Sequence, residues 1–321
     1  MPNMKAIKRR RLTVKNISQI TKAMNLVATS KLQRARNALA AVSSPVRATF
    51  DIVYNTVSHP NALEHPLMQP RQTIKNTAYV VITGNRGLCG GYNSNVCKEL
   101  IRHVKENGVN PIIIPIGTKG RDYLRRRNYN VMDFRQDDTA VPAENSTAKT
   151  DAFSYEDAHE ISNLLVDMYM KGEVDEVYVV YTQFVTILNL TPIVRKVLPI
   201  DPAYLRRVVA DNLAEDETWE DLGFFQKPEA KRDRAIGETE FEPELAEVLA
   251  NVIPWYLSMF MYAAMTSANL CEHAARMTSM DSSTKNAGEI IEKLTLQFNR
   301  QRQSIITQEI TEIVSGANAL Q

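Results

Sequence analysis

The stretch Ala287–Val314, AGEIIEKLTLQFNRQRQSIITQEITEIV, decides the architecture of this chain. Its apolar side chains recur at spacings of three, four and seven, which trace one narrow stripe along an α-helix. With a one-residue slip in its second half, the stripe consists of Ile291, Leu294, Phe298, Ile305, Ile306, Ile310 and Ile313. The stripe is impure, because Gln301, Arg302 and Gln308 stand where a strict coiled coil would place leucines.

The whole segment from Trp255 to Gln321 contains no proline, and its glycines are Gly288 and Gly316. At about 1.5 Å per residue, a continuous helix of that length is on the order of 100 Å long. A domain of this size cannot cover such a helix along its whole length. The sequence therefore predicts that part of the helix finds a partner helix and that part projects.

The N-terminal segment supplies a candidate partner, because residues 5–44 contain neither glycine nor proline. Apolar residues follow one another there at threes and fours: Ile17, Ile20, Met24, Val27, Ala28, Leu32, Ala35, Leu39 and Val42. This pattern predicts a second long amphipathic helix, which extends toward Ser58 if Pro45 only kinks it. Small contact residues such as Ala28, Ala35 and Ala38 would let a neighbouring helix approach closely. The alternative is that each terminal helix packs separately on a globular core.

The middle of the chain changes its periodicity, with short β-branched runs alternating with helical patterns. The runs that we expect to form strands are 78–83, 111–116, 129–134, 174–181 and 190–200, and the expected helices are 94–106, 118–127 and 155–170. Apolar strands that alternate with helices predict an α/β fold with a mainly parallel sheet covered on both faces. We divide the chain into an N-terminal helix (1–58), a linker (59–75), an α/β lobe (76–202), an acidic insertion (203–243) and a C-terminal helix (244–321).

The net charge of +1 conceals a strong asymmetry along the chain. No carboxylate occurs before Asp51, whereas the same segment is rich in lysine and arginine, and the balance reverses between Asp211 and Glu247. The three cysteines are an odd number and form no CxxC motif, which indicates a reducing compartment and no disulfide framework.

Two segments of the chain have the composition of targeting or membrane segments. The acid-poor, arginine-rich N-terminus is similar to an organellar transit peptide, but the helical pattern continues without a break past residue 40, so we expect no cleavage. The run Val248–Met265 approaches membrane-spanning length, yet it contains Asn251, Pro254 and Ser258 and has no basic flank. We expect it to be a buried helix of a soluble chain.

A glycine turn follows the first expected strand, at Gly84, Gly87, Gly90 and Gly91. Strand, glycine turn and helix can form a phosphate cradle, but this spacing matches neither GxGxxG nor GxxxxGK[ST]. We interpret it as a tight turn, with a nucleotide site as the alternative. The five histidines are scattered, and no nucleophile–base pair or HExxH motif is visible. The sequence predicts no catalytic residue, no cofactor and no metal site.

Four motifs carry a resemblance to a known family: Ile20-Thr-Lys-Ala-Met24 with Val27-Ala-Thr-Ser-Lys31, Arg86-Gly-Leu-Cys-Gly-Gly91, His273-Ala-Ala-Arg-Met277, and Ser304–Gly316. In the same order and at matching spacing, they resemble the gamma subunits of F-type ATP synthases over nearly the whole chain. The resemblance implies an antiparallel coiled coil made from the two chain ends and a Rossmann-like lobe that binds no nucleotide.

The resemblance also implies partners and a function. The coiled coil would sit inside a hexamer of three alpha and three beta subunits, and the lobe would rest with epsilon on the c-ring. Proton flow would turn the ring and the shaft, so that the shaft drives the catalytic beta sites through their conformations in turn. We expect no catalysis by the chain itself, and a peripheral location on the cytoplasmic face of a bacterial plasma membrane rather than an organellar one.

Contact residues follow from the same resemblance. Gln303 and Thr307 match the segment gripped by beta-subunit loops, and Met24 matches an adaptable contact position. The residues expected to face acidic beta loops are Lys22, Lys31, Arg34, Arg36 and Arg276. Gln308 would present a polar surface to successive neighbours, and the residues expected in an apolar sleeve are Ile310, Ile313, Val314 and Leu320.

One segment departs from the family pattern. The stretch Ala203–Phe241 is longer than in typical bacterial relatives and lacks the cysteine pair that plastid gamma subunits carry there, so thiol regulation is not supported. A brake or docking role and a passive loop both stay open. Two other classes of function stay as alternatives. One is nucleic-acid binding through the basic N-terminal arm, against which the absence of aromatic residues before Phe50 counts. The other is a nucleotide-dependent oxidoreductase that would use the glycine turn.

Overall fold

The computed structural model describes residues 4–57, 65–107, 110–132, 153–201 and 245–319. The acidic insertion, the start of the linker and Leu320 lie outside the described residues. The chain forms two compact units, one made of Met1–Thr29 with Arg276–Gln321 and the other of Ser30–Ala275. We call the first the paired-helix unit and the second the lobe unit.

Two long helices run through both units. α1 (Met4–Val57) continues through Pro45, as the sequence allowed, and α7 (Leu245–Ala319) contains Pro254. Each proline lacks the N–H that would bond four residues back. Four residues after each proline, a hydroxyl side chain bonds to its carbonyl: Thr49 Oγ1 donates to Pro45 O at 2.9 Å, and Ser258 Oγ donates to Pro254 O at 2.8 Å.

The lobe unit contains a four-stranded sheet in the order β2-β1-β3-β4. β1 (Asn76–Ile82) pairs in parallel with β2 (Asn110–Ile116) on one side and with β3 (Glu176–Phe184) on the other. β4 (Leu190–Leu198) joins β3 through an antiparallel hairpin. The predicted mainly parallel sheet is therefore confirmed, with one antiparallel edge strand.

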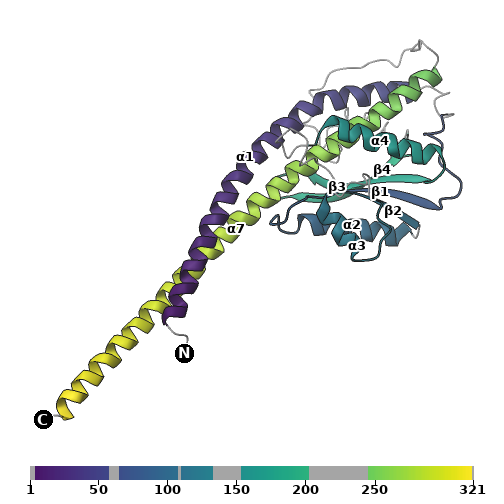
Figure 1. Ribbon diagram of the computed structural model, residues 1–321. Coiled ribbons are helices and arrows are strands. Elements are labelled where there is room, and N and C mark those ends of the chain that lie inside the picture. The colour runs from purple at the N-terminus through teal and green to yellow at the C-terminus, as the bar shows by residue number, and fades with distance from the viewer. Residues whose placement is uncertain (1–3, 58–64, 108–109, 133–152, 202–244, 320–321) are drawn as a thin grey trace. The chain divides into compact units, whose positions relative to one another are not determined.

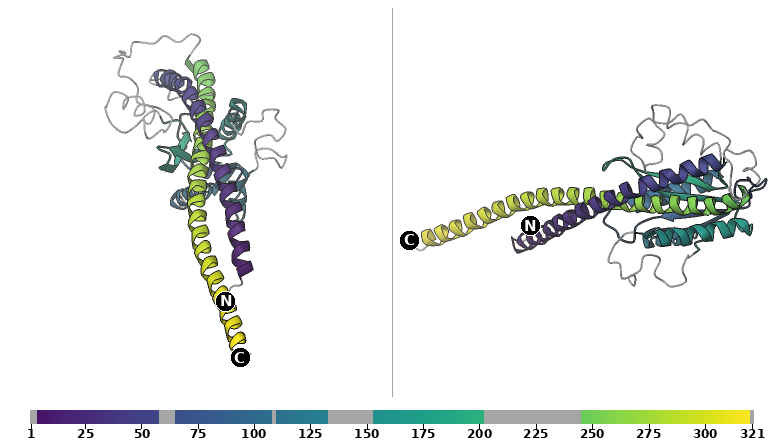
Figure 2. Two further views of the ribbon diagram at one scale, coloured as in Figure 1. Left: turned by 90° about the vertical axis from the view of Figure 1, so that its left-hand side faces the viewer. Right: turned by 90° about the horizontal axis from the view of Figure 1, so that it is seen from above.

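The helices of the lobe cover both faces of this sheet, as Figures 1 and 2 show. α2 (Tyr92–Asn107) and α3 (Thr118–Arg125) lie on one face. α4 (Tyr155–Met170) and the lobe part of α7 lie on the other, where His159 Nδ1 of α4 is 3.0 Å from Ser258 Oγ of α7. Ser154 begins α4 with a capping box that includes Asp157.

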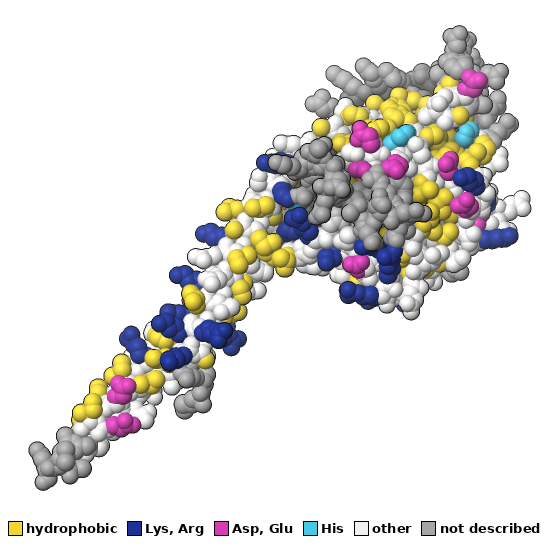
Figure 3. All heavy atoms as spheres, viewed as in Figure 1, with side chains coloured by type: hydrophobic (Ala, Val, Ile, Leu, Met, Phe, Trp, Pro, Cys, Tyr) yellow, Lys and Arg dark blue, Asp and Glu magenta, His cyan; other side chains and the backbone are white. Residues whose placement is uncertain are grey.

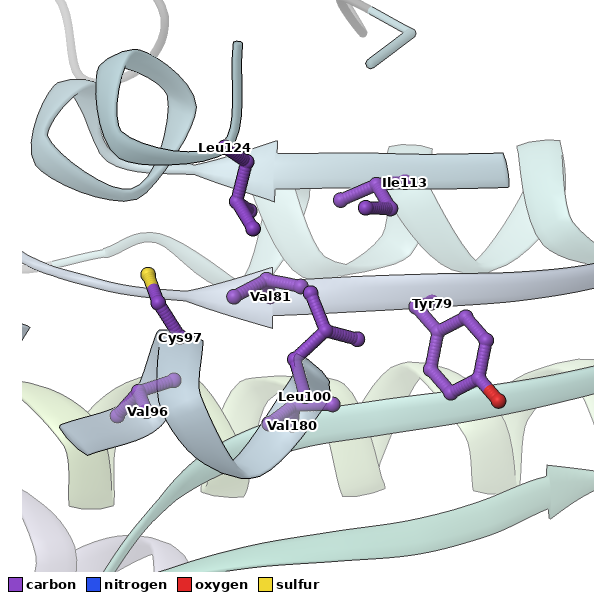
Figure 4. Close-up of a cluster of buried hydrophobic side chains, with 8 residues drawn as sticks. All are labelled: Tyr79, Val81, Val96, Cys97, Leu100, Ile113, Leu124 and Val180. Carbon is purple, nitrogen blue, oxygen red and sulfur yellow. The ribbon is translucent and has the colours of Figure 1, made fainter. Parts of the chain in front are cut away.

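The strands are continuous apolar runs in the sequence because their side chains are buried in the core between α2, α3 and the sheet. β1 is buried on both faces after its first residue, as expected for a central parallel strand. Figure 4 shows the side chains that meet on the α2 face: Tyr79, Val81, Val96, Cys97, Leu100, Ile113, Leu124 and Val180.

One predicted strand is wrong. The run 129–134 forms only an isolated bridge, between Val131 and Ile113, and residues from 133 on lie outside the described part. The short segment after α3 turns at Asn128, whose φ of 59° is left-handed. Within the described residues, the chain after α3 therefore meets the edge of β2 at this single bridge.

The predicted buried helix is confirmed. Leu249, Ile253, Leu257 and Met261 of α7 are all buried within the lobe unit. By length and composition alone, the part of α7 from Glu247 to Ser315 also passes as a possible membrane span, but 61% of its most apolar window is buried inside the protein. A buried core helix of a soluble protein has the same composition.

A carboxylate fixes the start of the sheet. Asp175 accepts hydrogen bonds from the backbone N–H groups of Lys75 (2.7 Å) and Asn76 (3.0 Å) and pairs with Arg71 at 3.2 Å. Burial acts to raise the pKa of this carboxyl, but the N–H groups of Asn76 and Lys75 and the Arg71 guanidinium together hold the pKa below its ordinary value of 3.8. The charged form is thus preferred in the folded state.

We predict that this carboxylate stabilises the lobe above pH 4 and that its contribution disappears as the pH falls below 3.8. Asp175→Asn should lower the free energy of unfolding at pH 7 by about 2 kcal/mol, because Arg71 and two N–H groups lose their charged partner. Urea unfolding at pH 7 and pH 3 measures both effects. The control is Glu106→Gln, in an exposed pair with Arg102, which should change stability by less than about 0.5 kcal/mol. Equal losses in the two variants would contradict the prediction.

Candidate functional site: the paired helices and the glycine turn

Three contacts define how α1 and α7 pair in the paired-helix unit. Asn25 Nδ2 donates to Met277 O at 2.9 Å, and the hydroxyl oxygens of Thr21 and Thr284 are 2.7 Å apart. The guanidinium carbon of Arg11 lies 5.2 Å from the centroid of the Phe298 ring. As the residue number falls along α1, the number of its partner on α7 rises. The two helices are therefore antiparallel, and Figures 1 and 2 show the same arrangement.

The contact line between the helices, here called the seam, repeats every seven residues on both sides. On α1 its buried or half-buried members are Met4, Ile7, Arg11, Val14, Ser18, Thr21, Asn25 and Ala28. On α7 they are Met277, Met280, Thr284, Ala287, Ile291, Leu294, Phe298, Gln301 and Ile305. A strict seven-residue repeat is the spacing of a left-handed coiled coil. Gln301 is a polar member of the seam, as the sequence predicted.

Part of the predicted stripe on α1 is wrong. Ile17, Ile20 and Val27 were expected at the helix contact, but their exposed fractions are 48%, 59% and 56%. The seam instead uses Ser18, Thr21 and Asn25, one position further on. Small and polar side chains let the two backbones approach, so the larger apolar residues beside them are left on the surface. Ile20, half-buried Met24 and Val27 form a stripe there, at spacings of four and three.

The last turns of α7 have no partner helix within the described residues. The seam reaches Ile305, and its spacing would continue through Gln308, Glu312 and Ser315, all exposed. The apolar residues slip to another face, where Ile306, Ile310 and Ile313 are 44%, 56% and 71% exposed. Figures 1 and 2 show this end of α7, in yellow, continuing past the described start of α1. The one-residue slip in the sequence thus marks where the internal pairing ends.

The sequence-predicted contact residues lie mostly on surfaces of these helices. Lys22, Arg34 and Arg36 are exposed on α1, while Met24 and Lys31 are half-buried there. On α7, Arg276 is half-buried and the exposed residues are Gln303, Thr307, Gln308, Ile310, Ile313 and Val314. Lys22, Met24, Arg276 and the C-terminal set belong to the paired-helix unit, but the C-terminal set lies further along α7 than the turns that face Lys22 and Met24. Lys31, Arg34 and Arg36 belong to the lobe unit.

The part of helix α1 that belongs to the pair carries basic residues and no acidic ones. Between Met4 and Thr29 it has no carboxylate, and its basic residues are Lys5, Lys8, Arg9, Arg10, Arg11, Lys15 and Lys22. In the space-filling view of Figure 3, dark blue side chains follow the paired helices, and magenta ones appear near the end of α7. Such a surface attracts acidic partners and speeds their association.

The glycine turn is held by hydrogen bonds and by close packing against α7. Asn93 Oδ1 accepts from the N–H of Gly84 at 2.8 Å. A Cβ on Gly84 would lie 2.6 Å from the carboxyl carbon of Glu272, so glycine permits a close approach of α7. Gly90 has a left-handed φ of 58°. Gly87, by contrast, faces open space.

The start of α2, which follows the glycine turn, packs on α7 through a small buried cluster of Cys89, Tyr92 and Cys271. The Tyr92 hydroxyl donates to Ala268 O at 3.0 Å, and the Cys271 thiol donates to Thr182 O at 3.4 Å. Burial raises the pKa of the Cys271 thiol, which keeps it protonated and unreactive. In doubly wound folds this carboxyl edge of the sheet holds the ligand. In this chain, residues of α7 pack against it, which agrees with our interpretation of a structural turn.

Sequence reasoning missed the polar members of the seam. A pattern of apolar residues alone does not include Ser18, Thr21, Asn25 or Thr284. A seven-residue count that allowed small and polar side chains would have found them. Among the described residues, no three His, Cys, Asp or Glu side chains come together as a possible metal site.

Comparison with known proteins agrees with the paired helices and the lobe. A sequence model of the family described as ATP synthase matches residues 3–320. The ATP synthase gamma chain of Desulforamulus reducens is 38% identical over 321 residues, which is 100% of both chains. The chain belongs to the ATP synthase gamma-chain family. A second gamma chain, from Pelotomaculum thermopropionicum, is 35% identical over 100% of both chains.

Solved structures show the same fold. A chain of the Euglena gracilis mitochondrial ATP synthase, from a cryo-EM structure containing OSCP, F1 and the c-ring, matches with a TM-score of 0.61 at 18% identity. The match covers 99% of this chain and 94% of that one. A chain in the rotor structure of the same enzyme gives a TM-score of 0.57 over 94% and 98%. The gamma-chain fold is thus a pair of terminal helices with an α/β lobe, as the sequence predicted.

Proposed function

We propose that this member of the gamma-chain family is the central-stalk rotor of an F-type ATP synthase. It would carry rotation from a proton-driven c-ring to three catalytic beta subunits without catalysing a reaction itself. The observation that carries this proposal is the end of α7, where Ile306, Ile310 and Ile313 form an apolar face beyond the intrachain seam. A helix face of this kind, on a chain of this family, fits the sleeve formed by an alpha–beta hexamer.

The proposal explains why this apolar face is narrow and interrupted. A shaft has to turn inside its bearing, so deep interdigitation with one neighbour would lock it. Gln303, Thr307 and Gln308 are exposed polar residues in the same turns as the isoleucines. Polar groups of this kind can exchange hydrogen bonds with successive beta subunits and with water at little cost.

The basic surface supports a second contact with the hexamer. Lys22 and Arg276 in the paired-helix unit, and Lys31, Arg34 and Arg36 on the lobe part of α1, would face acidic loops of the beta subunits. Single exposed ion pairs contribute little energy, but a basic surface steers and orients an acidic partner. Screening by salt weakens such contacts, so they guide rotation without fixing one position.

The lobe unit would contact the membrane sector. We propose that the lobe and the neighbouring turns of the terminal helices rest, with epsilon, on the c-ring. The chain would thereby be a peripheral protein of the membrane-associated complex, on the cytoplasmic face of a bacterial plasma membrane. This placement needs no spanning helix, and the buried state of the apolar part of α7 supports it.

Gentle affinity purification of the tagged chain from its native membranes tests the proposal. Intact-complex mass spectrometry reads the stoichiometry directly. We expect one copy of the chain with three copies each of two larger ATPase subunits, together with a smaller stalk subunit and a ring. A tagged chain with Lys5, Lys8 and Arg9 changed to glutamine provides a control for purely electrostatic capture.

Recovery of the chain alone, or with nucleic acid whose retention falls steeply with salt, would overturn the rotor proposal. Such a result would indicate that the basic α1 segment binds nucleic acid, because counterion release makes nucleic-acid binding strongly dependent on salt. The absence of aromatic residues before Phe50 counts against that alternative.

A further inference from the structure

The seam between α1 and α7 contains polar contacts where residues 21–25 of α1 meet residues 277–284 of α7. Thr21 is buried, and its hydroxyl oxygen is 2.7 Å from that of Thr284. Four residues further along α1, the Asn25 amide donates to the backbone carbonyl of Met277 at 2.9 Å. Each contact joins residues more than 250 positions apart in the sequence.

Each hydroxyl of the pair also has a backbone acceptor on its own helix. Each threonine hydroxyl has a single hydrogen to donate. Thr284 Oγ1 lies 2.8 Å from Met280 O, closer than the 3.1 Å between Thr21 Oγ1 and Ser18 O. Either threonine can therefore donate the hydrogen of the bond across the seam, while the other donates to the carbonyl of its own helix.

The apolar part of the seam selects the axial register only weakly. On α1, four of its members are the polar residues Arg11, Ser18, Thr21 and Asn25. On α7, Ala287, Leu294 and Gln301 are seven residues apart. If one helix shifted by seven residues along the other, the seam residues of α1 would therefore still face seam residues of α7. A polar pair at the core of a coiled coil discriminates between such registers, because only one of them satisfies it. After a shift of seven, Thr21 would face Ile291 or Met277, which have no hydroxyl.

We propose that Thr21 and Thr284 are positioning residues that fix the axial register of the two helices; we call this pair the polar lock. When a two-stranded rod is twisted, its helices tend to slide past each other, and a directional bond across the seam opposes that movement. The lock keeps the contact surfaces of α1 and α7 in step. Its role in transmitting rotation rests on the proposed rotor function, whereas its role in setting the register does not.

The lock has little to do with stability, and this separates it from an ordinary core contact. In a Thr284→Val variant, Thr21 can donate to Ser18 O instead. In a Thr21→Val variant, Thr284 still donates to Met280 O. The double variant replaces the pair by two apolar side chains of nearly the same shape, which is close to neutral for stability. We expect its unfolding temperature to stay within about 3 °C of that of the native chain or to rise.

Cross-linking in the purified complex reads the register. Cysteines at Arg11 and Phe298, which are in contact, report the native register. Cysteines at Arg11 and Ile291, or at Arg11 and Ile305, report a shift of one heptad. A short bifunctional thiol reagent is applied to each pair in the native background, in Thr21→Val with Thr284→Val, and in the control Thr29→Val. Thr29 is exposed and makes the same kind of bond to its own helix, at 2.9 Å to Asn25 O.

In the native and control backgrounds we expect only the 11–298 product. In the double-valine background we expect the shifted products to rise at least fivefold, with an unfolding temperature like that of the native chain. Retention of the native product alone in that background would overturn the proposal. If the double variant fails to fold, Thr284→Val alone gives the same test, because it leaves every donor with a partner.

Proton pumping per ATP hydrolysed, measured on the same complexes, separates the two proposals. We expect it to fall about twofold in the double-valine complex. Shifted cross-links with unchanged pumping would support the polar lock and count against the proposed rotor function.

Discussion

Gly117→Ala should strongly destabilise the lobe. Gly117 joins β2 to α3 with a φ of 102°, a conformation that residues with a Cβ rarely adopt. A Cβ at this position would lie 2.1 Å from the carbonyl oxygen of Thr83, which belongs to the backbone and cannot move aside like a side chain. Strain and overlap each cost about 1–3 kcal/mol.

The neighbouring hydrogen bonds explain why Thr83 cannot give way. Its N–H donates to Ile116 O at 2.8 Å, and its hydroxyl accepts from the N–H of Gly120 at 2.9 Å. These bonds tie the end of β1 to the end of β2 and the start of α3. Moving Thr83 away from the new methyl group would break this junction.

We therefore expect Gly117→Ala to lower the free energy of unfolding by about 4 kcal/mol and the unfolding temperature by about 10 °C. Thermal unfolding followed by circular dichroism measures this. The matched control is Gly87→Ala in the glycine turn, where a Cβ meets nothing within 4 Å, and we expect a shift of less than about 2 °C. Equal shifts in the two variants would show that crowding at Thr83 is not the cause.

Met24→Lys should reduce coupling several-fold while leaving the fold intact. Met24 is half-buried beside the seam, in the stripe that Ile20 and Val27 leave on the surface of α1. A lysine can extend from this position into solvent, so the helix pair should tolerate it. Under the proposed function, the new ammonium group meets acidic loops of the beta subunits in a partly desolvated joint.

A close charge pair of that kind is worth about 1.5 kcal/mol or more, which is roughly tenfold in an equilibrium. Because a rotor has to leave each contact in turn, an attraction of this size at one position slows or bypasses a step. We expect proton pumping per ATP to fall about threefold or more, with ATP hydrolysis changed by less than about twofold. Raising the salt concentration should restore part of the loss, because screening weakens the added pair.

Leu26→Lys is the matched control. Leu26 is exposed on the same helix, but it points about 160° away from Met24, since successive residues are about 100° apart. The same charge on that side should leave pumping per ATP unchanged. Equal losses in both variants would mean that added charge, and not the stripe containing Met24, is responsible.

The sequence by itself determined the fold class and the helical structure of the two chain ends. The segment 5–44 lacks proline and glycine and has apolar residues at threes and fours, which predicts a helix, and the apolar β-branched run 78–83 predicts a strand buried on both faces. The helix 155–170 was predicted with the bounds that the structure shows. The slip at Ile306 was visible as a pattern, and the motifs at both ends and in the middle of the chain together carried the family resemblance.

Only the tertiary structure decided which face of each helix is the seam. The residues of α1 that a hydrophobic count selects, Ile17, Ile20 and Val27, are exposed, while Thr21 and Asn25 make the contact. A helix with apolar residues on two adjacent faces gives no local signal of which face has a partner within the chain. That choice depends on how closely the partner backbone approaches, and small or polar residues permit the closest approach. Thr83 and Gly117 meet for a similar reason, because the sheet register brings together two strand ends more than thirty residues apart.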